Sequence, residues 1–246
     1  NLVMLTRKSI HKFIFIYAKH IFPVSKDISN LYNIKYKSNT TILRTPVISL
    51  HNITDEYLLN EYNPKKILRV IRVCLLQESK GLENLIHVVN NLKKKYEIKV
   101  DIYGEAKNID YKSKIIMLID KFKLSQNIEL KGWVSNDQLK KLYNNYDLHL
   151  VSSVSEGMPR VCLEASAYGL PQILTPVGGV EDYYRHMHDA YICKNYSINA
   201  IENGIIWFIE NPKKAKSMAI NSLKNIKTDT IEETTSTINK ILDKFL

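Results

Sequence analysis

Residues 147–176 read DLHLVSSVSEGMPRVCLEASAYGLPQILTP, and this stretch predicts a strand, a helix and a second strand in close succession. The first apolar run, at 147–153, has the length and composition of a buried strand. A helical pattern over 158–168 ends at Gly169, and Pro171 follows directly, as is typical of a helix C-terminus. A second short strand begins at Pro171. This order is that of a βαβ unit with parallel strands.

The same alternation of apolar runs and helical patterns extends over the chain from residue 67 onward. We expect further strands at 67–73, 98–104, 127–133 and 190–193, and further helices at 80–95, 111–124, 135–146 and within 197–246, with a loop at 177–184. Regular alternation predicts an α/β fold, a Rossmann-like parallel sheet with helices on both faces. Such sheets bind ligands at the carboxyl ends of their strands, which is where the segment after 147–153 lies.

The first part of the chain differs from this pattern. We expect residues 1–50 to be the tail of another αβ domain, 51–66 to be a linker, and 67–246 to be the main domain with its C-terminal helices. The stretch TRKSIHKFIFIYAKH, at 6–20, has a charged edge beside an aromatic and aliphatic one. A helix with these two edges suits a membrane surface, and it equally suits packing on a sheet.

Composition restricts the classes of protein that this chain can represent. With 246 residues, 45% apolar and 24% charged, it has the content of an ordinary globular protein. The net charge of +10 fits a lysine-rich solvated surface, an anionic ligand or an anionic membrane. Basic residues are not interleaved with exposed aromatic ones in an obvious stripe, so nucleic acid is not an expected partner. Three cysteines without a CxxC motif favour a reducing, cytoplasmic setting and argue against a zinc site.

The start of the helix at 158–168 has the chemistry of a nucleotide-sugar site. Pro159 fits the first helical turn, and the free N–H groups of Arg160 and Val161 then form a cradle for phosphate. Glu156 precedes this helix start and Glu164 lies on the helix. A carboxylate accepts two hydroxyl donors at once, so each glutamate can hold a sugar diol.

Other interpretations of these residues stay open on spacing alone. Glu164 and Arg160 are four residues apart and could form an ordinary surface ion pair. Glu156 and Gly157 could form a simple turn. No Asp-x-Asp motif is present, and His186 and His188 do not share a helix face, so we expect no metal site.

Several motifs occur here in the order of one known family. They are Lys80-Gly81, the segment LKGWVSNDQLKKLYNNYDLHLVSS (130–153), Glu-Gly-x-Pro at 156–159, Leu-Glu-Ala at 163–165, Gly-x-Pro at 169–171 and Val-Gly-Gly at 177–179. Together they resemble the donor-binding signature of the retaining glycosyltransferases of group 1, or family 4, which have the GT-B fold. The resemblance covers residues 67–195 well and 20–46 loosely.

The resemblance implies a role for each site residue. Glu156 and Lys80 would be catalytic, the first contacting the transferred sugar and the second neutralising the leaving diphosphate. Glu164 would hold the ribose hydroxyls. The other donor-binding residues would be Gly157, Met158, Pro159, Arg160 and Val161 around the phosphates, and Trp133 and Val134 near the base. The co-substrate would be a nucleotide-diphosphate sugar, with no other cofactor.

The sequence departs from the family pattern at three places. Cys74 and Leu75 stand where the family has Gly-Arg, so an arginine that binds phosphate is missing. Gly104-Glu105-Ala106 replaces a Gly-x-Gly, and Ala190 replaces a late loop glycine.

The resemblance also implies a function for the whole protein. A hexose-type sugar would be transferred with retention to a hydroxyl of a sugar or lipid-linked saccharide, in bacterial surface polysaccharide synthesis at the inner face of the membrane. Residues 1–50 would belong to the acceptor-side domain. Two alternatives are a non-catalytic nucleotide-sugar-binding module or degenerate partner subunit, and a sugar-nucleotide epimerase with the same fold.

Overall fold

The computed structural model describes residues 21–23, 26, 29–30, 40–41, 63, 66–227 and 230–244. The chain divides into two compact units, Asn1–Thr45 and Pro46–Leu246. In the first unit Ile21 and Thr40 form a parallel bridge, in which the Thr41 N–H donates to the Ile21 carbonyl at 3.1 Å. The stretch at 6–20 and most of the expected linker lie outside the described residues.

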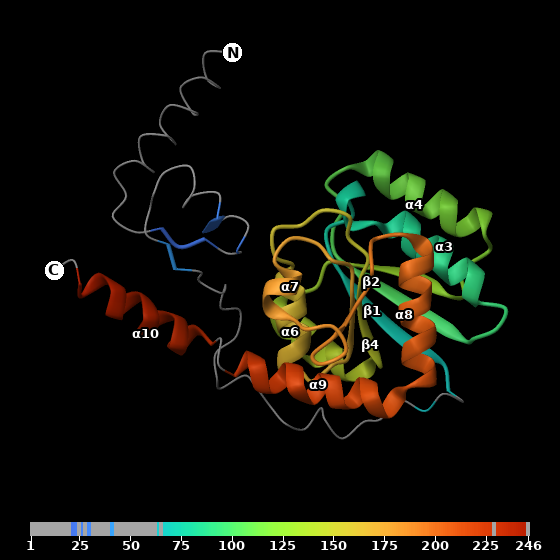
Figure 1. Ribbon diagram of the computed structural model, residues 1–246. Coiled ribbons are helices and arrows are strands. Elements are labelled where there is room, and N and C mark those ends of the chain that lie inside the picture. Colours follow the sequence, from blue (N-terminus) through green and yellow to red (C-terminus); the bar gives the residue numbers. More distant parts are fainter. Residues whose placement is uncertain are drawn as a thin grey trace, which may run out of the picture. The chain divides into compact units, whose positions relative to one another are not determined.

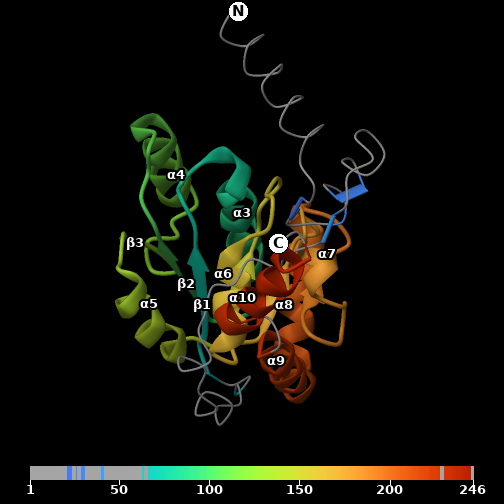
Figure 2. The same ribbon diagram turned by 90° about the vertical axis from the view of Figure 1, so that its left-hand side faces the viewer.

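The second unit contains a six-stranded sheet in which every neighbouring pair of strands is parallel. Its strands are β1 (Leu68–Val73), β2 (Ile98–Tyr103), β3 (Ile128–Gly132), β4 (Leu148–Val151), β5 (Gln172–Leu174) and β6 (Tyr191–Ile192). The order in space is β3-β2-β1-β4-β5-β6, and Figure 2 shows β3, β2 and β1 side by side. The order reverses between β1 and β4, and ligands of open α/β sheets bind at such a switch point.

Helices cover both faces of this sheet (Figure 1). They are α3 (Leu82–Leu92), α4 (Ile109–Lys121), α5 (Asn136–Leu142), α6 (Arg160–Ala167), α7 (Val180–Tyr183), α8 (Ile198–Glu210), α9 (Pro212–Ile226) and α10 (Ile231–Leu242). Helix α3 packs against α4 and α8, whereas α6 packs against α9. Two apolar clusters result, because successive residues of a strand face opposite sides: Val70 of β1 belongs to the first and Ile71 to the second. Among the helices that the structure describes, none has the length and apolar character needed to span a bilayer.

The expected fold class is confirmed, and the six strands begin and end within two residues of their expected bounds. Ser135 is the N-cap of α5 and forms a capping box with Gln138. Helix boundaries were less accurate: α3 and α4 end three residues before their expected ends, at Leu92 and Lys121. Helix α6 begins at Arg160 instead of 158, and Pro159 is its N-cap with φ −72° and ψ 101°. Proline disfavours helical geometry in the residue before it, so Met158 does not start the helix. The expected loop at 177–184 also contains the short helix α7.

Candidate functional site

The loops that follow β1 and β4 meet at the carboxyl edge of the sheet. The loop after β1 passes through a 3-10 turn (Glu78–Lys80) and reaches Gly81, whose φ is 61°. A Cβ atom on Gly81 would lie 2.0 Å from the Ser152 carbonyl oxygen, so only glycine permits this close approach. The Ser152 hydroxyl donates to the Lys80 carbonyl at 3.0 Å and ties the two loops together.

Lys80 and Glu156, the two residues expected to be catalytic, form an ion pair at this point. The Lys80 Nζ lies 2.6 Å from Glu156 Oε1, and the two side chains are only 14% and 13% exposed. The Ser153 hydroxyl donates to the same Oε1 at 2.8 Å. Glu156 Oε2 has no hydrogen bond to any residue that the structure describes, which leaves it free to accept a ligand hydroxyl.

Arg72 underlies this pair and was missed by the sequence analysis. It lies in β1 and is fully buried. Its Nη2 donates to the Ser153 hydroxyl at 2.8 Å and to the Lys80 carbonyl at 3.3 Å. Ser153, which was also missed, therefore connects Arg72 to Glu156. The available signal was that the two arginines of LRVIRV, Arg69 and Arg72, are three residues apart, so that strand geometry places them on opposite faces of the sheet.

The turn before α6 is held by the loop that follows β5. The Gly179 N–H donates to the Gly157 carbonyl at 2.6 Å. Gly178 has a φ of 52°, and a Cβ atom there would lie 1.8 Å from the Gly157 oxygen. The Thr175 hydroxyl, also after β5, donates to the Ser153 carbonyl at 2.7 Å. The expected Val-Gly-Gly loop therefore supports the Glu156 turn from the β5 side.

The start of α6 offers unpaired donors. Pro159 caps the helix without a side-chain hydrogen bond, and its carbonyl accepts from the Cys162 N–H at 3.0 Å. The N–H groups of Arg160 and Val161 have no hydrogen-bond partner among the described residues, as is general for a first helical turn. Arg160 is exposed, whereas Met158 and Val161 pack partly against the second apolar cluster. This arrangement can bind an anion.

Glu164 lies one turn further along α6. The Tyr143 hydroxyl donates to its Oε2 over a long 3.5 Å. Burial raises the pKa of the Glu164 carboxyl above its usual 4.5, although the nearby Arg160 charge acts in the opposite direction. No ion pair within 4.0 Å joins Arg160 and Glu164, both of which the structure describes, so the surface-pair alternative is not realised. Glu164 is thus a carboxylate with few protein partners.

Trp133 and Val134 follow β3 and are not in contact with the Lys80–Glu156 pair. Trp133 is 65% exposed, while Val134 packs partly against the second apolar cluster. Trp133 lines a hollow of about 470 Å³ together with Glu105, Lys112 and Lys131. The end of β3 is three strand spacings from the end of β4, or roughly 14 Å at about 4.8 Å per strand.

The position of the missing arginine is occupied by residues that do not replace it. Leu75 is 37% exposed. Cys74 is half-buried, and burial raises the pKa of its thiol despite the neighbouring charges of Arg72 and Lys80. The thiol is therefore protonated at neutral pH and is not a nucleophile. Within the described part of the chain, no three His, Cys, Asp or Glu side chains are placed to hold a metal ion.

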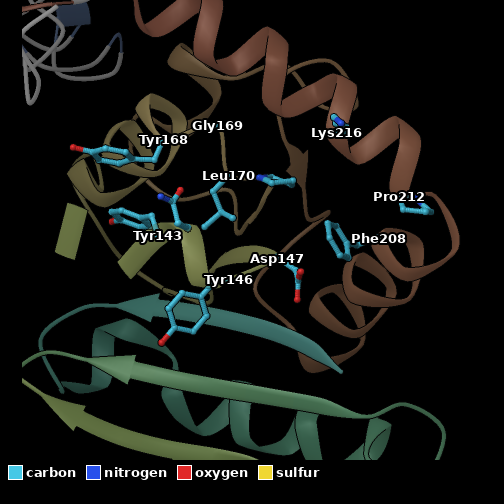
Figure 3. A pocket seen from close by; sticks show the side chains of 11 residues that line it. Tyr143, Tyr146, Asp147, Tyr168, Gly169, Leu170, Phe208, Pro212 and Lys216 are labelled. Atoms are coloured by element: carbon cyan, nitrogen blue, oxygen red, sulfur yellow. The ribbon is translucent and has the colours of Figure 1, made fainter. Parts of the chain in front are cut away.

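A small cavity lies at the amino ends of strands β4 and β5, opposite the candidate site (Figure 3). Its walls include Asp147, directly before β4, and Leu170, just before β5. Its volume of about 40 Å³ suits one or two water molecules and is too small for a sugar. It takes no part in the candidate site.

The chain is similar to known glycosyltransferases in sequence. Residues 58–225 match the model of the family "Glycosyl transferases group 1". An uncharacterized glycosyltransferase of Methanocaldococcus jannaschii is 30% identical over 117 residues, which cover 48% of this chain and 29% of that one. The GtfA subunit of a UDP-N-acetylglucosamine–peptide N-acetylglucosaminyltransferase of Streptococcus parasanguinis is 35% identical over 117 residues, covering 48% of this chain and 19% of that one. The chain thus spans less than a third of the length of these two relatives.

Solved structures with the same fold include a larger and a smaller protein. HepE of Anabaena, in complex with UDP and glucose, has a TM-score of 0.80 at 17% identity, and the match covers 94% of this chain and 65% of that one. The C-terminal domain of LpcC, a group 1 protein of Francisella tularensis, has a TM-score of 0.59 at 21% identity, covering 68% of this chain and 90% of that domain. The family match extends over more than half of the sequence, and the sheet has the architecture of a GT-B domain. The chain belongs to the group 1 glycosyltransferases, a retaining family with the GT-B fold.

Proposed function

We propose that this protein transfers a sugar from a nucleotide-diphosphate sugar to an acceptor hydroxyl with retention of configuration. The observation that carries this proposal is the Lys80–Glu156 pair at the switch point of the sheet, beside the free N–H groups that begin α6. This arrangement combines one cation, one carboxylate and two amides near the switch point, where open α/β sheets form the crevice that binds ligands. A diphosphate joined to a sugar presents the matching groups.

The donor would lie along the carboxyl edge of the sheet. Its diphosphate would contact Lys80 and the amides of Arg160 and Val161, because a helix start and a lysine both favour negative charge. Glu156 Oε2 would accept hydroxyls of the transferred sugar, and Glu164 would accept those of the ribose. The base would extend toward Trp133, about three strands away, where an exposed aromatic ring can stack on it.

Catalysis in this proposal is mainly electrostatic. Charge develops on the diphosphate as the bond to the sugar breaks, and Lys80 with the α6 amides stabilises that charge. The carboxylate of Glu156 lies on the sugar side and stabilises the positive character of the oxocarbenium-like carbon. Both effects require that the crevice hold the donor in one orientation.

The substrates and the pathway are proposed at a coarser level. We infer a hexose-type donor sugar, an acceptor that is a sugar or a lipid-linked saccharide, and a place in bacterial surface polysaccharide synthesis. This inference draws on the group 1 family and on the net charge of +10, which suits an anionic membrane surface. The cytoplasmic face of the membrane is the expected location.

A second candidate is a nucleotide-sugar-binding module without catalytic activity. The absence of arginine at Leu75 favours it, because less positive charge is then available for the leaving diphosphate. A transferase and a non-catalytic module would both bind the donor, but only the transferase would turn it over. An epimerase of the same fold would instead release a changed sugar nucleotide in the absence of an acceptor.

The proposal is tested by calorimetry with UDP, GDP and ADP and with their common hexose derivatives, followed by transfer or donor-hydrolysis assays on the donors that bind. Lys80→Ala should weaken binding of the diphosphate, while Lys140→Ala should not. Lys140 is a matched control because it forms an exposed ion pair with Asp137 at 3.1 Å. If the wild-type protein binds none of these nucleotides, the proposed function is wrong. Binding without turnover would support the module.

A further inference from the structure

Arg72 is an unusual residue for the interior of a sheet. It is 0% exposed, and its Nε and Nη1 groups have no hydrogen-bond partner among the residues that the structure describes. No carboxylate of the described residues lies within ion-pair distance of it. An arginine stays charged in proteins, and a buried charge without a direct partner is costly. A residue of this kind needs a compensating interaction, because an apolar side chain would otherwise fill the same space at lower cost.

The contacts of Arg72 all lead to the candidate donor site. Its Nη2 donates to the Ser153 hydroxyl, which in turn donates to Glu156 Oε1, and Glu156 pairs with Lys80. The same Nη2 also reaches the Lys80 carbonyl. The network thus holds two cations and one carboxylate. Its side chains carry a net charge of +1, which an anion would neutralise.

We propose that Arg72 is a positioning residue of the donor site, which holds Glu156 through Ser153 and adds a buried positive charge beneath the diphosphate. This inference rests on the proposed function. Because the Ser153 hydroxyl is fixed as an acceptor from Arg72, its own proton must point to Glu156 Oε1, which keeps Oε2 available for the sugar. Arg72 would in this way take over part of the charge that an arginine at Leu75 would have supplied.

A purely structural role for Arg72 predicts different results. In that case the guanidinium only ties the loops after β1 and β4 together, and its loss would affect folding and every ligand equally. The positioning role predicts instead that loss of Arg72 lowers the affinity for some ligands more than for others. The affinity for a nucleoside diphosphate should fall more than that for the monophosphate, because the diphosphate carries more charge into the crevice. The extra affinity that the attached sugar provides should also fall.

The experiment compares Arg72→Met and Arg72→Lys in the full chain, with whichever nucleotide the wild-type protein binds. Methionine fills similar space without charge, so thermal unfolding should change little or shift upward. We expect Arg72→Met to weaken diphosphate binding about tenfold and monophosphate binding by less than threefold, as an estimate for one buried charge several ångströms from the ligand. Arg72→Lys should recover most of the diphosphate affinity, because it keeps the charge.

If Arg72→Met does not fold, Ser153→Ala tests the same inference. This smaller change removes the link between Arg72 and Glu156 and leaves both charges in place. It should reduce the sugar-dependent part of donor affinity and spare the bare diphosphate. Equal losses for monophosphate, diphosphate and nucleotide-sugar in the folded variants would overturn the inference. Nucleotide binding by the wild type with no loss in any variant would also overturn it, and would leave the proposed function standing.

Discussion

Replacing Glu156 with glutamine separates the two roles that we propose for the Lys80–Glu156 pair. Glutamine keeps the shape of the side chain and removes its charge. The Lys80 ammonium is paired with Glu156 at 2.6 Å, and both side chains are largely buried. An incoming diphosphate must compete with this carboxylate for Lys80. We therefore expect Glu156→Gln to bind a bare nucleoside diphosphate more tightly than the wild type.

The magnitude follows from the burial of the pair. Exposed ion pairs contribute about 0–1 kcal/mol, and the attraction within a partly buried pair is screened less, so the competition for Lys80 is taken as about 1–1.5 kcal/mol. Releasing Lys80 from it should tighten diphosphate binding by roughly five- to tenfold. The nucleotide-sugar should gain less, because hydrogen bonds from its hydroxyls to a charged acceptor become bonds to a neutral amide, a loss of about 1 kcal/mol. The sugar-dependent part of the affinity should thus fall by roughly fivefold or more.

The assay is calorimetry with the bare diphosphate and the matching nucleotide-sugar on both proteins. Asp137→Asn is the control, since Asp137 forms a comparable pair with Lys140 on the exposed surface. Lys80→Ala provides the reference for a lost phosphate contact. If Glu156→Gln weakens the bare diphosphate as much as Lys80→Ala does, the carboxylate supports the phosphate site and the assignment of Glu156 to the sugar is refuted.

Three further predictions concern other parts of the site. Glu164→Gln should stabilise the folded protein at neutral pH by on the order of 1 kcal/mol, because the raised pKa of Glu164 means that folding disfavours its ionised carboxyl; urea unfolding should show this gain vanish below the ordinary pKa of 4.5. The same substitution should weaken nucleotide binding, and the nucleotide affinity of the wild type should fall as the pH drops through the raised pKa of Glu164. Gly178→Ala should abolish donor binding or folding, measured by calorimetry and circular dichroism, because its Cβ would lie 1.8 Å from the Gly157 oxygen; an active variant would refute the close packing. Donor affinity should survive EDTA, because the phosphate site that we propose consists of Lys80 and backbone amides; a loss restored by magnesium would contradict this.

The sheet could be predicted because its elements depend on local patterns. Buried parallel strands are continuous apolar runs, and each is followed by a helix with its own start and stop signals. Ser135 and Gln138, for example, specify the start of α5 through a capping box. The start of α6 was placed too early, because the effect of Pro159 on the residue before it was not considered. The helix α7 has only four residues and lies in a glycine-containing loop, where periodicity gives little signal.

The site was predictable only in part, because its contacts join distant residues. The motif at 156–159 identified Glu156, and the family resemblance suggested Lys80, but spacing alone does not bring them together. Their pairing depends on the reversal of strand order between β1 and β4. Arg72 could not be interpreted without this reversal, since an arginine in a strand is usually read as an exposed edge position. The roles assigned to the site residues, those of Glu156 and Lys80 as well as those of Glu164, Trp133 and Val134, stay predictions.

Introducing an arginine at Leu75 asks whether Arg72 and the missing arginine are exchangeable. Leu75 is 37% exposed and follows β1 by two residues, on the loop that leads to Lys80, so a long side chain there has room to reach the crevice. We expect Leu75→Arg to tighten diphosphate binding by about three- to tenfold in the wild-type background, in line with one partly screened charge. In the Arg72→Met background it should restore affinity for the bare diphosphate. It should not restore the sugar-dependent part, because Ser153 would still lack the hydrogen bond from Arg72 that orients its hydroxyl toward Glu156. Recovery of both parts would mean that Arg72 acts by charge alone, and recovery of neither would show that Leu75 does not face the phosphates.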